Sequence, residues 1–147
     1  MNFWDSSAIV ALLVGQPGSD AVTDLRRRDA MMVVWWGTWV ECASAIARLV
    51  REKAIGAKDA QRAGADLSAL SKVWGEVEPT TAVRERAIAL VSRHPLKAAD
   101  ALQLGAASLA LSSVGADGPS FVCLDRQLCA AARSEGLSVY PAEGDIR

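Results

Sequence analysis

Short apolar segments alternate with longer helical segments along this sequence, and that order constrains the fold more than any other feature. The apolar segments are NFW, MMVVWW, SFVCL and LSVY, at residues 2–4, 31–36, 120–124 and 137–140. Strands that are buried on both faces of a parallel sheet have this short, continuous apolar pattern. We therefore expect an α/β fold in which a central parallel sheet carries helices on both faces.

Helical patterns fill the intervals between these segments. They are expected at residues 6–15, 18–30, 39–53, 58–73, 80–93, from 95 onward and at 126–136. Thr38 is expected to cap the third helix, and Pro95 suits the first turn of the sixth. Asp100 would then lie in or near the first turn of its helix. The length of 147 residues suits one domain, so residues 1–147 are expected to form a single domain.

Four acidic residues stand out against this background. Asp5 and Asp125 each follow a predicted strand, and open parallel sheets bind ligands outside the carboxyl ends of their strands. Glu41 and Asp100 each interrupt an otherwise apolar helix. Four such acids cannot all ionise side by side unaided, because like charges raise one another's pKa.

A hard divalent cation would relieve this repulsion. Mg²⁺ and Mn²⁺ favour oxygen ligands, and Mg²⁺ keeps several of its waters. One or two such ions activate water and stabilise in-line attack on phosphate. The pattern therefore suggests a metal-dependent phosphodiesterase whose catalytic and metal-binding residues are Asp5, Glu41, Asp100 and Asp125.

Each acid also has a purely structural interpretation. Asp5 and Asp125 could be helix N-caps, and Asp100 could complement the dipole of its helix. Glu41 could pair with Arg48, two turns further along the same helix. Because a carboxylate has two oxygens, capping and metal binding are compatible, and spacing alone leaves both interpretations open.

The segments around these acids resemble the successive acidic motifs of PIN-domain proteins. They are FWDSSAIVALL, VECASAIARL, LKAADALQLGAA and FVCLDRQLCAAARSEGLSVY, which extend from the first predicted strand to the last. The pair AADALQLGAA and FVCLDRQL is the most specific part. The likeness is strongest to the VapC-type toxins of bacterial toxin–antitoxin pairs.

This resemblance implies a flavodoxin-like α/β/α sandwich and a metal-dependent endoribonuclease. In such proteins the acids that match Asp5, Glu41, Asp100 and Asp125 hold Mg²⁺ or Mn²⁺ and a hydrolytic water, and RNA is cut by attack on phosphorus. Ser7 matches a hydroxyl residue that often lies near the metal ligands. The resemblance further implies a homodimer and a VapB-like antitoxin that blocks the site.

Charge supports a modest form of RNA binding. The formal net charge of −1 indicates no general basic surface, although without the four acids the basic residues outnumber the remaining acidic ones. Arg126, directly after Asp125, is a candidate RNA contact; otherwise it is a solvated arginine at a helix start. The lack of a signal segment, of a membrane-length apolar run and of paired cysteine spacing predicts a cytoplasmic protein with reduced, buried thiols.

Two other functions remain open at this point. A non-catalytic PIN-like binding module would act through a protein partner without cleaving RNA. A phosphatase or phosphotransferase with Asp5 as nucleophile, in the haloacid-dehalogenase manner, would want a second aspartate where Ser7 stands. The single histidine, His94, and the absence of a nucleophile elbow or a phosphate-binding glycine loop give no support to a serine hydrolase, a zinc site or a nucleotide hydrolase.

Overall fold

The computed structural model describes residues 1–29, 31–112 and 118–145, and in this part of the chain five strands form one sheet. The strands are β1 (Asn2–Trp4), β2 (Met32–Trp35), β3 (Gly75–Val77), β4 (Phe121–Val122) and β5 (Val139–Tyr140). Their order in the sheet is β3-β2-β1-β4-β5, and every pair of neighbours is parallel. The predicted α/β fold with a central parallel sheet is confirmed.

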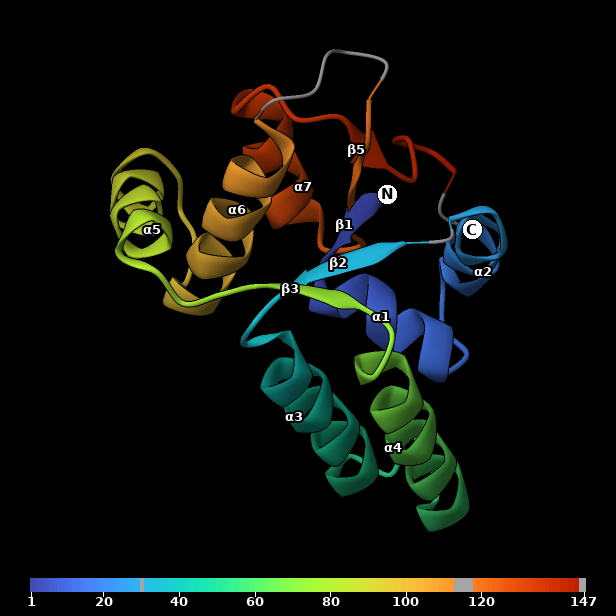
Figure 1. Ribbon diagram of the computed structural model, residues 1–147. Coiled ribbons are helices and arrows are strands. Elements are labelled where there is room, and N and C mark those ends of the chain that lie inside the picture. Colours follow the sequence, from blue (N-terminus) through green and yellow to red (C-terminus); the bar gives the residue numbers. More distant parts are fainter. Residues whose placement is uncertain (30, 113–117, 146–147) are drawn as a thin grey trace.

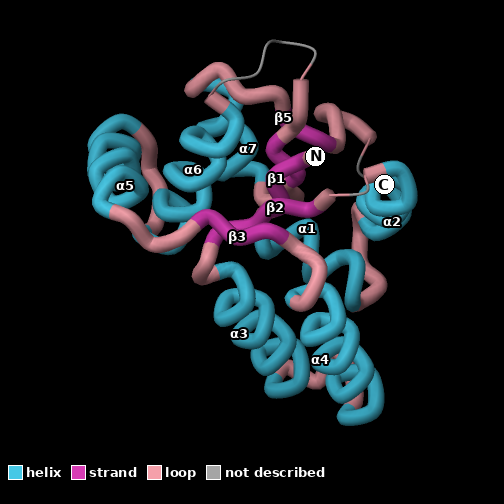
Figure 2. The backbone as a smooth tube through the Cα atoms, in the orientation of Figure 1, coloured by secondary structure: helices cyan, strands magenta, loops and turns pink. Residues whose placement is uncertain are grey.

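Helices cover both faces of this sheet (Figure 1). Those described are α1 (Ser6–Leu13), α2 (Ser19–Arg28), α3 (Thr38–Arg51), α4 (Ala57–Ser71), α5 (Thr81–Arg93), α6 (Ala98–Leu111) and α7 (Arg126–Ser134). In Figure 2 the strands run between α5, α6 and α7 on one side and α1, α3 and α4 on the other. The arrangement is the predicted α/β/α sandwich.

Each face of the sheet has its own apolar core. Phe3 of β1 packs into the core beside α5, α6 and α7, whereas the next residue, Trp4, packs into the core beside α1 to α4. Successive side chains of a strand point to opposite faces. Both of these side chains are fully buried, which explains why the strand sequence is continuously apolar instead of alternating.

The structure corrects three local predictions. Residues 75–77 form β3, a strand that was not among those expected from the sequence; Gly75 and Glu76 are exposed, so this edge strand carries no buried apolar run. Helix α3 begins at Thr38, and its N-cap is Gly37 instead of the predicted Thr38. The Thr38 hydroxyl accepts a hydrogen bond from Gln103. Pro95 precedes α6, which begins at Ala98, and Asp100 does lie in its first turn.

Two further predictions concern the thiols and the membrane. Cys42, Cys123 and Cys129 are buried free thiols, as expected. Across the described ranges, no helix combines the length and the apolar character that a membrane span requires.

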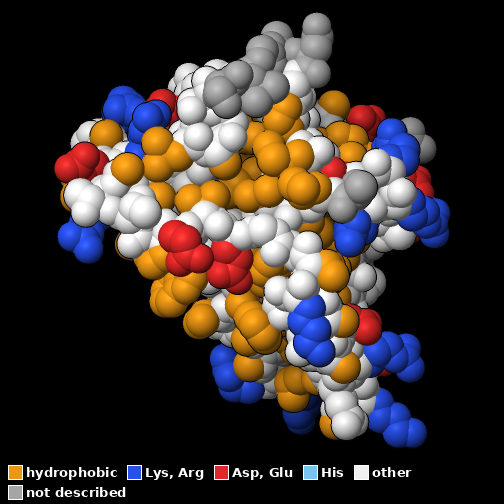
Figure 3. Space-filling view, viewed as in Figure 1, with side chains coloured by type: hydrophobic (Ala, Val, Ile, Leu, Met, Phe, Trp, Pro, Cys, Tyr) orange, Lys and Arg blue, Asp and Glu red, His pale blue; other side chains and the backbone are white. Residues whose placement is uncertain are grey.

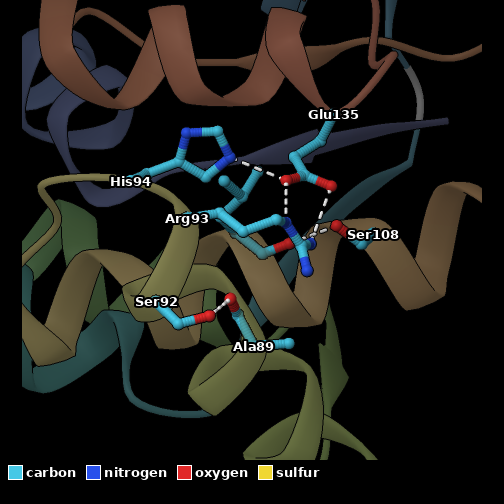
Figure 4. A network of polar contacts seen from close by, with 7 residues as sticks. Ala89, Ser92, Arg93, His94, Ser108 and Glu135 are labelled. Atoms are coloured by element: carbon cyan, nitrogen blue, oxygen red, sulfur yellow. Dashed lines mark hydrogen bonds and ion pairs between the residues drawn. The ribbon is translucent and has the colours of Figure 1, made fainter.

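An ionic cluster joins the C-terminal ends of α5 and α7 (Figure 4). The carboxylate of Glu135 accepts hydrogen bonds from Arg93 Nε and Nη2 at 2.9 and 3.0 Å, and lies 2.6 Å from His94 Nε2. The Arg93 and His94 contacts hold the pKa of the Glu135 carboxyl below its usual value. The one histidine of the chain therefore belongs to a contact between two helices.

We expect Glu135→Gln to lower the melting temperature slightly at neutral pH. Because the folded-state pKa of Glu135 is lowered, its stabilising contribution is present above the ordinary pKa of 4.5 and is lost as the pH falls through the folded-state value. Thermal unfolding of variant and wild type should therefore differ at pH 7 and converge in acid. Glu85→Gln, at an exposed position of α5, is the control, and a difference in melting temperature that does not depend on pH would contradict this account.

Candidate active site

The four acids predicted from the sequence line one cavity at the carboxyl edge of the sheet. Asp5 directly follows β1 and Asp125 comes after β4, and these two strands are neighbours. Glu41 and Asp100 lie in the first turns of α3 and α6. All four side chains belong to the lining of a cavity of about 520 Å³.

Asp5 is held between the ends of two strands. It is 3% exposed, and its Oδ2 caps α1 by accepting a hydrogen bond from Ser7 N at 3.0 Å. The Ser7 hydroxyl donates to the same oxygen and accepts from Leu124 N, beyond β4, at 2.9 Å. Within the described chain all hydrogen bonds to this carboxylate reach Oδ2, which leaves Oδ1 for a ligand. The cap interpretation is therefore correct and does not compete with a ligand-binding role.

Burial raises the pKa of Asp5, and the Ser7 hydrogen bonds only partly offset this. The negative charge of Asp100 raises the pKa further. Ser7, which the resemblance placed near the metal ligands, therefore contacts Asp5 directly through two hydrogen bonds.

Glu41 is half-buried and is held from the protein interior. Its Oε2 accepts a hydrogen bond from Nε2 of Gln103, on α6. Burial raises the pKa of Glu41 to about 7, with the Gln103 hydrogen bond opposing and the charges of Asp5 and Asp100 adding to the shift. Arg48 also lines the cavity, but the described side chains of Glu41 and Arg48 form no ion pair, so the predicted pairing of Glu41 with Arg48 is wrong.

Asp125 is an exposed N-cap, whose Oδ1 accepts from Leu128 N at 2.9 Å at the start of α7. Asp100 is half-buried. Burial raises its pKa, the charge of Asp125 adds to this, and Lys97 opposes it. Asp100 is therefore the member of the set that interacts electrostatically with each of the other three acids.

The donor set fits a divalent cation of the Mg²⁺ type. Every donor is a carboxylate oxygen, and a bound cation would offset the burial and mutual repulsion that raise these pKa values. Over the described ranges, no three acidic, histidine or cysteine side chains are grouped closely enough to hold a metal by themselves. Mg²⁺ commonly binds one or two carboxylates and keeps several waters, so the arrangement suits a partly hydrated ion. Which acids bind it stays a prediction.

Two polar residues of the cavity lining were not proposed as site residues from the sequence, where Arg48 was considered only as a partner of Glu41. Ser44 and Arg48 line the cavity with Glu41. They lie three and seven residues after it, on one face of α3, and this helical spacing is a signal that could have identified them. Arg126 is exposed and lines a different cavity, beside α7, with Arg133. Its contact with RNA stays a prediction.

Comparisons with known proteins agree with this architecture. The family model described as PIN domain matches residues 3–114. The fold is similar to VapC20 of Mycobacterium tuberculosis, a sarcin–ricin loop cleaving toxin, with a TM-score of 0.65 and 17% identity over 89% of this chain and 95% of that chain. It is similar to FitAcB from Neisseria gonorrhoeae, with a TM-score of 0.62 and 16% identity over 95% and 96% of the two chains.

A toxin–antitoxin complex from Klebsiella pneumoniae is also similar, with a TM-score of 0.57 and 17% identity over 85% of this chain and 87% of that chain. At identities this low, the likeness is one of fold. Comparison with curated proteins gives no match.

Proposed function

This chain belongs to the PIN domain family, and on that premise we propose that it is a metal-dependent endoribonuclease, a VapC-like toxin. The observation that carries the proposal is the single cavity lined by four carboxylates at the carboxyl edge of the sheet. The proposed ligands of Mg²⁺ or Mn²⁺ are Asp5, Glu41, Asp100 and Asp125. Hydrolysis of an RNA phosphodiester bond is the chemistry that such a site supports best.

A bound Mg²⁺ or Mn²⁺ would supply an activated water and would stabilise negative charge at phosphorus. The chain itself positions the groups around that chemistry. Ser7 fixes Asp5 and joins it to the end of β4, and Gln103 holds Glu41. Asp5 is the buried member of the four acids, and electrostatic interactions are stronger in such surroundings than in water.

Basic side chains near the cavity matter more for RNA binding than the total charge does. On the face shown in Figure 3, the Lys and Arg side chains are scattered over the outer helices and do not form one patch. Arg48 is exposed and lies in the lining of the acid cavity. We propose that its guanidinium contacts an RNA phosphate.

We expect Arg48→Gln to weaken RNA binding several-fold at low salt. Loss of one phosphate contact should reduce the slope of log affinity against log salt concentration by about 1. Fluorescence anisotropy with labelled RNA over a salt series measures both quantities. Arg51→Gln is the matched control, because Arg51 is an exposed arginine on the same helix outside the cavity lining. Identical behaviour of the two variants would remove Arg48 from the RNA-binding surface.

The proposal extends to partners and setting. The Klebsiella neighbour is a toxin–antitoxin complex, and this supports a VapB-like antitoxin as the partner that blocks the site. We also propose a homodimer of single-domain chains in the cytoplasm.

Cleavage of RNA by the purified protein tests the proposal. Cleavage should require Mg²⁺ or Mn²⁺, stop when EDTA is added and return when the metal is restored in excess. Folded protein that cleaves no RNA with either metal would contradict the nuclease proposal. That result would favour the alternative, a non-catalytic PIN-like binding module acting through a protein partner.

A further inference from the structure

A buried amide lies directly behind the acid cavity. Gln103 is fully buried on α6, where its neighbours Leu104, Ala106 and Ala107 are apolar and fully buried. Its Nε2 donates to Thr38 Oγ1 at 3.0 Å and to Glu41 Oε2. Gln103 therefore joins the first half of α6 to the first turn of α3, the turn that carries Glu41.

The orientation of this amide has a cost. With Nε2 turned toward Thr38 and Glu41, Oε1 of Gln103 is buried and has no hydrogen-bond partner among the described residues. Turning the amide over would place Oε1 against the carboxylate of Glu41, oxygen against oxygen. A buried polar group without a partner costs about 1–3 kcal/mol, and an apolar side chain of similar size would avoid that cost. Stability alone does not account for a glutamine at this position.

The amide does, however, restrict a side chain that would otherwise be mobile. A half-buried glutamate has several accessible rotamers. A ligand that binds only one of them loses part of its binding free energy to the conformational entropy of the side chain. The Gln103 hydrogen bond takes up Oε2 of Glu41 and leaves Oε1 of Glu41 for a ligand. Thr38, itself fully buried, accepts the second hydrogen bond of the same nitrogen, Nε2 of Gln103.

We propose that Gln103 is a positioning residue of the nuclease site, which holds the Glu41 carboxylate in the orientation that binds the metal ion. This inference rests on the proposed function. Gln103 acts through Glu41 and touches neither the metal nor the RNA. Partners that orient a metal ligand in this way typically contribute a factor of about 10–100 to metal affinity or activity.

The test compares metal binding with stability in Gln103→Met. The methionine is close to glutamine in size but lacks the N–H donor. Titration calorimetry with Mn²⁺ alone, on RNA-free protein, should show at least about tenfold weaker binding. The melting temperature of the metal-free protein should be unchanged or higher, because an unsatisfied buried atom is removed. The kcat for RNA cleavage should fall with the metal affinity, while KM for RNA stays near the wild-type value.

A double-mutant cycle shows whether Gln103 acts through Glu41. In a Glu41→Gln background, Gln103→Met should cause no further loss of Mn²⁺ affinity, because the group that it positions is already changed. An equal loss in both backgrounds would overturn the proposal. Gln103→Asn, which keeps an amide but is one methylene shorter, replaces Gln103→Met if the methionine variant does not fold.

Ser108→Ala is the matched control on the same helix. Ser108 is also buried, but its hydroxyl donates to Leu104 O within α6 at 2.8 Å, and Mn²⁺ affinity should not change. If Gln103→Met lowers the melting temperature and leaves Mn²⁺ affinity intact, Gln103 is structural and the inference is wrong. If the wild type itself neither binds Mn²⁺ nor cleaves RNA, the proposed function fails first. If the wild type does both and Gln103→Met matches it, only the inference fails.

Discussion

Asp100→Asn should abolish most of the metal-dependent RNA cleavage and leave the fold intact. Asp100 lines the cavity; its charge raises the pKa of Asp5 and of Glu41, and the charge of Asp125 raises the pKa of Asp100 itself. Asparagine keeps the shape of the side chain but loses the charge that attracts a cation. We expect kcat to fall by a factor on the order of 10²–10³, the size typical for loss of one group that stabilises transition-state charge.

Stability should move in the opposite direction to activity. Burial and the charge of Asp125 raise the pKa of Asp100 above its ordinary value of 3.8. A raised carboxyl pKa means that ionisation weakens the fold, so stability is lost as the pH rises above 3.8 toward the folded-state pKa. Metal-free Asp100→Asn should therefore be at least as stable as the wild type at pH 7. Added Mg²⁺ should raise the melting temperature of the wild type more than that of the variant.

Asp59→Asn provides the matched control for this experiment. Asp59 is also an acid in the first turn of a helix, α4, but it is exposed and lies outside the cavity lining. Its replacement should leave cleavage unchanged. Full cleavage by a folded Asp100→Asn protein would remove Asp100 from the active site and with it the central member of the proposed ligand set.

The central strands could be predicted because both faces of the sheet are covered. Phe3 and Trp4 point into opposite cores and are both fully buried, so β1 appears in the sequence as a continuous apolar run. The edge strand β3 could not be predicted, because its side chains are not buried in this way. Gly75 and Glu76 are exposed, and hydrogen bonds to a single neighbour, β2, leave no pattern in the side chains.

The acids could be proposed from the sequence because a charge in an apolar segment is conspicuous. Their arrangement around one cavity depends on parallel strands whose carboxyl ends meet, which the alternating pattern already predicts. Gln103 carries no charge, and its partners Glu41 and Thr38 lie 62 and 65 residues away along the chain. No local pattern reveals such a contact. The prediction that Thr38 caps its own helix failed for a related reason. Capping rules consider only hydrogen bonds between a hydroxyl and the neighbouring backbone, whereas the Thr38 hydroxyl accepts its hydrogen bond from the distant Gln103.

Gly105→Val should cause the largest loss of stability among these variants. A Cβ at Gly105, in the middle of α6, would lie 3.2 Å from Val83 O and 3.3 Å from Ala87 N, both backbone atoms of α5. Backbone atoms cannot move aside by a rotamer change, so α5 would have to shift away from α6. Overpacking of this kind costs about 1–3 kcal/mol or more. We expect a loss near the upper end of that range and a melting temperature lower by roughly 10 °C.

Gly64→Ala separates this packing effect from the general effect of replacing a helical glycine. Gly64 lies inside α4, and an added Cβ there meets nothing within 4 Å. Alanine is the better helix former by about 1 kcal/mol, so this variant should be more stable than the wild type in urea unfolding. Cleavage should also separate the two, because α6 carries Asp100 and Gln103 and α4 carries none of the proposed site. Equal stability of Gly105→Val and wild type would contradict the close approach of α5 to α6. That approach sets the position of α6 and therefore of Asp100 and Gln103.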